Sequence, residues 1–149
     1  MSLEQKVMAG MKTAMLAKDE KSLRSLRAVK AAIIIAKTAE GAGGEINENE
    51  EIKLLQKLVK QRKDSLEIYE KQDREDLASK EREEIEVIER FLPKQMSEAE
   101  LKTVIAKIIE ETGASSAADM GKVMGAANKQ LAGKADGKTI SGIVKELLS

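Results

Sequence analysis

A single proline, Pro93, stands in a chain whose apolar residues otherwise recur at helical spacing. Helix interiors exclude proline, so a chain of 149 residues with one proline can be helical along nearly all of its length. Aromatic residues make up only 1%, which leaves Leu, Ile, Val, Ala and Met to form the core. With 35% charged residues, this composition is typical of helical proteins and predicts an all-α fold.

Seven helices are predicted from the capping residues and the apolar spacing. Ser2 with Gln5, Asn47 with Glu50, and Ser97 with Glu100 match the reciprocal capping pattern at helix N-termini. The expected helices, with approximate ends, are 2–18, 19–40, 47–72, 74–92, 97–113, 116–133 and 136–149. In the second of them, Ile34 and Ile35 lie off the main apolar face, which indicates contact on more than one side.

Pro93 and the cap that follows it predict a domain boundary. Residues 1–93 are expected to form an elongated four-helix bundle or a pair of helical hairpins, with 41–44 as a glycine-rich loop. Residues 97–149 are expected to form a compact three-helix domain.

The residue types exclude several kinds of chemistry. The chain has no cysteine and no histidine, so it lacks a thiol nucleophile, the usual general base and the usual zinc ligand. It has no phosphate-binding P-loop, dinucleotide fingerprint or nucleophile elbow. No apolar run reaches membrane-spanning length and no signal peptide is visible. We therefore expect a cytoplasmic protein without a metal, a cofactor or a membrane anchor.

Charge is unevenly distributed although the formal net charge is zero. Residues 1–40 hold 8 Lys or Arg against 4 Asp or Glu, residues 41–111 hold 13 against 19, and residues 112–149 hold 5 against 3. The acidic run 81–89 is expected to pair with the basic segment 60–63. Pairs four residues apart are also predicted on the fourth helix: Lys80–Glu84, Arg82–Glu86 and Glu86–Arg90.

The sixth predicted helix contains two glycines on one face, Gly121 and Gly125. Each glycine costs a helix about 1 kcal/mol against alanine, so we expect a compensating close approach. The approaching group is either another helix, with Lys122 and Lys129 merely solvated, or the backbone of a ligand. In the second case the lysines supply charge for phosphates, together with Lys134 and Lys138.

A second basic stripe is formed by Arg24, Arg27, Lys30 and Lys37 on one helix. It is interpreted either as a solvated face or as a contact for an RNA backbone. No aromatic residues lie between these cations to stack on bases, so any RNA contact should depend on phosphates and shape.

Several segments together resemble one protein family. They are the stretch Asp119-Met-Gly-Lys-Val-Met-Gly125, the segments 133–138 and 140–148, and the earlier strings 23–30, 60–65 and 81–93. This order is similar to that of the GatB/YqeY family, and the likeness covers nearly the whole chain. That family includes the C-terminal domain of the B subunit of glutamine-dependent tRNA amidotransferases, and small free-standing YqeY-like proteins about the size of this chain. The N-terminal match places this chain with the free-standing proteins.

The resemblance implies a role connected with transfer RNA. Carbon–nitrogen ligase activity with glutamine as amido-N-donor is implied by kinship, but the domain that holds ATP and activated acyl-tRNA is absent here, and so is a glutaminase. Three hypotheses therefore remain. One is a tRNA-binding accessory protein of an aminoacylation or amidation complex, with its contact at Lys122, Lys129, Lys134 and Lys138. The others are a helical protein-interaction module with no RNA role, and an enzyme of the amidotransferase class.

Overall fold

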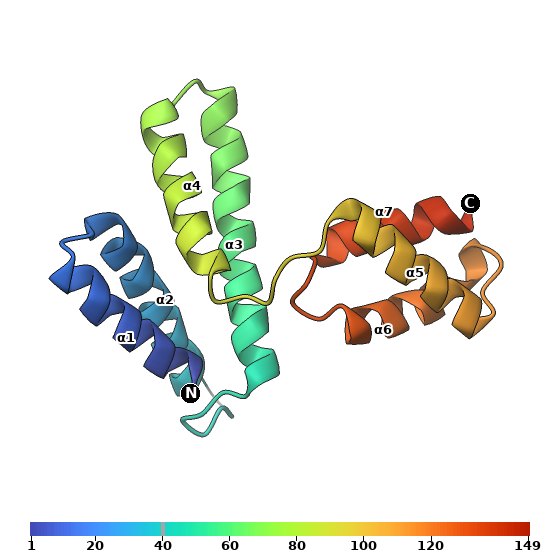
Figure 1. Cartoon of the computed structure of the whole chain (residues 1–149), viewed down its shortest axis with the longest axis horizontal. Helices are drawn as coiled ribbons and strands as arrows, with labels where there is room; N and C mark the ends of the chain where they lie inside the picture. Colours follow the sequence, from blue (N-terminus) through green and yellow to red (C-terminus); the bar gives the residue numbers. More distant parts are fainter. Residues whose placement is uncertain (40) are drawn as a thin grey trace. The chain divides into compact units, whose positions relative to one another are not determined.

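The computed structural model describes residues 1–39 and 41–149, and within them it contains α-helices and no strand (Figure 1). The helices are α1 (Leu3–Leu16), α2 (Glu20–Thr38), α3 (Glu48–Lys71), α4 (Glu75–Glu89), α5 (Glu98–Thr112), α6 (Met120–Gln130) and α7 (Gly137–Leu148), with a 3₁₀ turn at Ala117–Asp119. The all-α prediction is confirmed. The end predicted for the second helix, Glu40, lies outside the described residues.

Contacts divide the chain into two compact units, residues 1–92 and 93–149. Independent folding of residues 1–93 and 97–149 remains a prediction of the sequence. In the first unit, α1 with α2 and α3 with α4 form two helical hairpins, which meet mainly through α2 and α4. In the second unit, α5, α6 and α7 each pack against the other two.

The two hairpins turn in the same way. Two residues after the end of each first helix stands a residue in the left-handed conformation, Lys18 (φ 57°) after α1 and Asp73 (φ 54°) after α3. The following N–H then donates back five residues, from Asp19 to Ala14 O and from Arg74 to Tyr69 O, both at 2.9 Å. Side chains with a Cβ enter this region at a cost, which is why glycine is usual there. Glycine in place of Lys18 or Asp73 would avoid this cost and would therefore make the turn more stable.

The helix starts follow the predicted caps. Ser2 with Gln5 and Asn47 with Glu50 form reciprocal capping boxes, while Asp19 and Asp136 accept the N–H groups of Ser22 and Thr139. Ser97 accepts the Glu100 N–H at 3.2 Å as predicted. The reciprocal bond predicted there is wrong, because the Glu100 carboxylate accepts the Ser97 hydroxyl instead.

The core of the first unit is aliphatic, as the composition predicts. It includes Val7, Val29, Leu55 and Ile88, all at most 1% exposed. The prediction that α2 is contacted beyond its main face at Ile34 and Ile35 is wrong, since these side chains are 46% and 70% exposed. Helices α1, α3 and α4 all contact α2, but they leave these two side chains exposed.

The second unit has a core of its own, built around Leu101, Ile105, Val123 and Val144. Helix α6 ends at Gln130, three residues before the predicted end at Gly133, which adopts a positive φ of 77° in the turn that follows. Backbone and side-chain bonds fasten the segment before α5 to this turn, from Met96 N to Lys134 O and from Gln95 Nε2 to Gly133 O at 2.7 Å.

Candidate nucleic-acid-binding surface

The four lysines predicted to contact RNA all lie exposed on the second unit. Lys122 stands in the first turn of α6 and Lys129 in its last, Lys134 lies in the connection to α7, and Lys138 stands in the first turn of α7. None of the four forms an ion pair with any described residue. Three of them therefore lie in or beside the α6–α7 connection, and Lys122 lies about 10 Å further along the helix from Lys129.

The two glycines of α6 face open space. A Cβ added at Gly121 or Gly125 would meet no atom within 4 Å, so the predicted crossing of another helix of this unit is wrong. The buried side of α6 carries Val123 and Ala127, and the glycines lie on the opposite, solvent side. Approach of a partner's backbone to these glycines remains a prediction.

A close helix crossing does occur at a glycine that the sequence did not single out. A Cβ at Gly10 on α1 would stand 3.3 Å from Leu26 Cδ1 on α2. Gly10 thus lets the first hairpin close tightly. Nothing in the local pattern distinguishes it from Gly121, because only the packing of the hairpin decides which glycine faces a neighbour.

A carboxylate of the chain binds the loop that precedes α6 and its 3₁₀ turn. Asp119 Oδ2 accepts the backbone N–H groups of Ser115 at 3.0 Å and Ser116 at 3.4 Å. These bonds lower the pKa of Asp119, and the charge of Lys122 acts in the same direction. The positive charge of Lys122 is therefore partly balanced by Asp119.

The structure adds Lys145 to this set. It is exposed on α7, seven residues after Lys138, so the two share one face with Gly142 between them. An added Cβ at Gly142 would also meet no atom within 4 Å. This repeats the arrangement of Lys122, Gly125 and Lys129 on α6, and the spacing of seven was the signal in the sequence that could have revealed it.

Half of the second basic stripe is engaged by acidic residues of the chain. Arg24 pairs with Glu83 at 3.0 Å and with Glu84 at 3.1 Å. Lys37 pairs with Glu4 at 2.6 Å. Arg27 and Lys30 form no ion pair with a described residue. The stripe is therefore not one continuous basic surface.

Glu84 stands at the centre of the ion pairs that hold the first unit together. Arg62 Nε donates to Glu84 Oε2 at 2.9 Å, and both side chains are only 16% exposed. Lys63 also reaches Glu89, at 3.6 Å, so the predicted pairing of 60–63 with the acidic helix is confirmed at these two residues.

The pairs predicted within α4 are only partly found. Glu86 and Arg90 pair at 3.4 Å as predicted. Glu84 instead binds Arg24 and Arg62, and Arg82 binds Glu70 and Glu75. Partners on α2 and α3, and Glu75 at the start of α4, thus take the place of the predicted partners four residues away.

Glu81 lies beside this network without a partner for one of its oxygens. Its Oε2 is buried and accepts no hydrogen bond from the described residues. Burial, and secondly the charge of Glu84, raise the pKa of Glu81, although Arg62 and Arg24 oppose the effect. The charged form of this carboxylate therefore costs the fold free energy.

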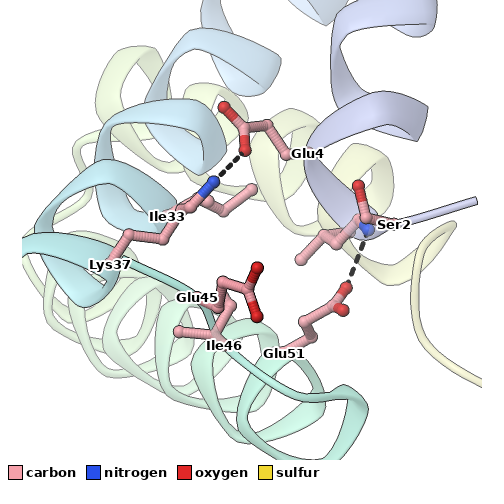
Figure 2. Close-up of a pocket in the computed structure, with 8 residues that line it drawn as sticks. Ser2, Glu4, Ile33, Lys37, Glu45, Ile46 and Glu51 are labelled. Atoms are coloured by element: carbon pink, nitrogen blue, oxygen red, sulfur yellow. Dashed lines mark hydrogen bonds and ion pairs between the residues drawn. The ribbon is translucent and has the colours of Figure 1, made fainter. Parts of the chain in front are cut away.

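A half-open pocket of about 270 Å³ lies where α1 begins (Figure 2). Glu51 Oε2 accepts the N–H of Leu3 at 2.8 Å, and Glu4 holds Lys37 across the opening. These bonds tie α1 to α3 and α2. Across residues 1–39 and 41–149 no group of three acidic side chains is placed to hold a metal ion.

None of the described helices is both long and apolar enough to span a membrane.

Comparison with known proteins settles the family. A family model described as Yqey-like protein matches residues 4–148, nearly the entire chain. The chain belongs to the YqeY-like family. The resemblance seen in the sequence is thereby confirmed, since this family is related to the C-terminal domain of GatB. No curated protein sequence matches the chain.

The family match covers the segment that carries the exposed lysines, but it names no function for them. The match includes both units, so a YqeY-like protein comprises the two hairpins as well as the three-helix unit.

Proposed function

We propose that this YqeY-like protein is a tRNA-binding accessory protein, whose contact with tRNA is made by the exposed lysines of α6 and α7. The observation that carries the proposal is a set of exposed lysines that form no ion pair with a described residue, beside glycines with open space around them. Lysine ammonium groups bind phosphate oxygens, and a helix without side chains at Gly121 and Gly125 lets a phosphate backbone come close. The kinship with an amidotransferase subunit makes tRNA the nucleic acid to test.

The chemistry favours binding over catalysis. The sequence offers no histidine or cysteine, and the second unit has an aliphatic core and exposed lysines. The accessory role consists of holding tRNA for an aminoacylation or amidation complex, which supplies the reactive groups. The contact is expected to read phosphate spacing and shape, because the chain carries only 1% aromatic residues for stacking on bases.

The test is tRNA binding by the full chain, measured by fluorescence anisotropy at about 50 and about 200 mM salt. Four phosphate contacts should weaken the affinity about a hundredfold between these concentrations. Replacing Lys122, Lys129, Lys134 and Lys138 by glutamine should abolish binding while the helical circular dichroism signal stays unchanged. Exposed lysines contribute little to stability, so the fold should persist.

A matched control variant removes the same number of positive charges from other positions in the chain. It replaces four other exposed lysines that form no ion pair with a described residue: Lys53, Lys57, Lys60 and Lys107. This variant should keep at least most of the affinity.

Two results would contradict the proposal. One is the absence of tRNA binding by the intact chain at low salt. The other is equal loss of affinity in the two variants, which would reduce the effect to overall charge. Loss of binding on changing Arg27 and Lys30 alone would move the contact to α2.

A further inference from the structure

Exposed apolar side chains gather on the first hairpin. Met8, Met15 and Leu16 on α1 are 49%, 60% and 78% exposed, and Ile34 and Ile35 on α2 are exposed as well. Elsewhere in the described residues, large exposed apolar side chains beyond Met1 stand singly, Ile68 on α3 and Leu147 on α7. Isolated cases are ordinary on protein surfaces, but a group of five on two adjacent helices indicates an interaction surface.

Part of this surface is hollowed into a groove. The methionine groove has a volume of about 290 Å³ and is lined by Met8, Met11, Lys12, Met15, Leu16 and Lys30. Met8, Met11 and Met15 follow one another by three and four residues along α1, so they form a continuous apolar row. Unbranched methionine side chains adapt to different apolar partners, as they do on surfaces that bind amphipathic helices.

The charges at the groove have one sign. Lys12 and Lys30 line it, exposed Arg27 precedes Lys30 on α2, and none of the described residues that line it is a carboxylate. None of these three cations pairs with an acidic side chain in the described parts of the chain. On the same helix Arg24 and Lys37 are neutralised by glutamates of the chain. The cations at the groove thus lack the acidic partners that their neighbours have.

We propose that the methionine groove is the docking site for an amphipathic helix of another protein, with Asp or Glu on both flanks of its apolar stripe. The apolar stripe lies along Met8, Met11 and Met15, and the acidic flanks meet Lys12 and Lys30. This surface belongs to the first unit, so the inference does not depend on the proposed tRNA contact in the second.

The groove fits a helix better than the two other candidate occupants. A second copy docked through the same groove would set Lys12 and Lys30 against the same lysines, which is repulsive. A membrane surface would take a protruding apolar face with many cations, whereas this surface is concave and has two lysines in its wall.

The test uses the full chain labelled with ¹³C at its methionine methyl groups and a synthetic helical peptide. The peptide has a leucine stripe flanked by glutamates, and a second peptide carries lysines in their place. The glutamate peptide should shift the signals of Met8, Met11 and Met15. The signals of Met96, Met120 and Met124 in the second unit are internal controls and should not move.

Charge reversal sharpens the test. Changing Lys12 and Lys30 together to glutamate should weaken the glutamate peptide about tenfold and should strengthen the lysine peptide. The matched control changes Lys53 and Lys57 on α3, which are exposed and outside the groove, and should leave both affinities unchanged. Leu16→Gln should also weaken the glutamate peptide, and because Leu16 is 78% exposed the fold should survive.

Several results would overturn the proposal. They include the absence of methionine shifts with the glutamate peptide, and equal affinity of the wild-type chain for the two peptides. Binding to vesicles of phosphatidylcholine and phosphatidylserine without any response to the peptide would assign the groove to a lipid surface. A dimer detected by sedimentation and lost in Leu16→Gln would assign it to a second copy.

Discussion

Substitution of alanine for Gly125 should make the second unit more stable, although the same change would be harmful at a close helix crossing. Gly125 lies in the middle of α6, where glycine is about 1 kcal/mol less favourable than alanine. The added Cβ would meet no atom within 4 Å, so no steric cost offsets this gain. We therefore expect a free energy of unfolding higher by about 1 kcal/mol. For a domain of about 60 residues this raises the melting temperature by about 4–8 °C.

The assay is thermal unfolding followed by circular dichroism, with the methyl signals of Met120 and Met124 reporting on the second unit. A fall in melting temperature of similar size would refute the reasoning, because it would show that a neighbouring group packs on Gly125. Gly125→Leu should likewise leave the unit folded, since a leucine side chain there points into solvent.

The same variants test the proposed contact with tRNA. If a phosphate backbone comes close at Gly125, Gly125→Leu should weaken tRNA binding about tenfold while the unit stays stable. Thr103→Ala on α5 is the matched control, because Thr103 is exposed and alanine favours the helix there too. It should raise stability without changing the affinity.

Three further changes test other features of the fold. Ile105→Ala, at a side chain 0% exposed, should destabilise the second unit by about 2–5 kcal/mol, and hydrogen exchange should show the first unit still protected if the two fold independently. Glu81→Gln should raise the melting temperature at pH 7 but have little effect near pH 4. The raised pKa makes the folded state hold this proton to a higher pH than the unfolded chain, so the wild type loses stability as pH rises from the ordinary glutamate range through the raised value. Asp73→Gly should raise the midpoint of urea unfolding by an amount equivalent to about 1 kcal/mol, because glycine adopts the positive φ of this turn without strain.

The helices could be predicted because their signals are local. A cap such as Asn47 with Glu50 satisfies N–H groups within one turn, and the apolar rows that include Leu55 and Val59 show their period within a single helix. The predicted helix ends are less accurate where no capping residue fixes them. Helix α6 ends at Gln130, and the turn that follows it is also held by a hydrogen bond from the segment before α5.

Interactions between distant residues could not be read from the same signals. Glu84 was expected to pair within α4, but Arg24 and Arg62 reach it from α2 and α3. Ile34 was expected to be covered, and its exposure depends on where α1 and α4 pack around α2. In both cases the outcome is fixed by which helices become neighbours, and spacing along one helix carries no information about that.

The excess of positive charge counted along the chain is a poor guide to how much positive charge each surface leaves unpaired. Residues 1–40 have the larger excess, 8 Lys or Arg against 4 Asp or Glu, yet Lys21, Arg24 and Lys37 pair with glutamates of the first unit. Residues 112–149 have the smaller excess, 5 against 3, and none of their lysines forms an ion pair with a described residue. Pairing of Lys21, Arg24 and Lys37 leaves five cations in residues 1–40 without an ion pair to a described residue, the same number as in residues 112–149, so the larger local excess gives the first unit no advantage in binding a polyanion. The lysines left at the methionine groove are too few for a polyanion and lie beside apolar side chains, which suits a helix that brings only a few carboxylates.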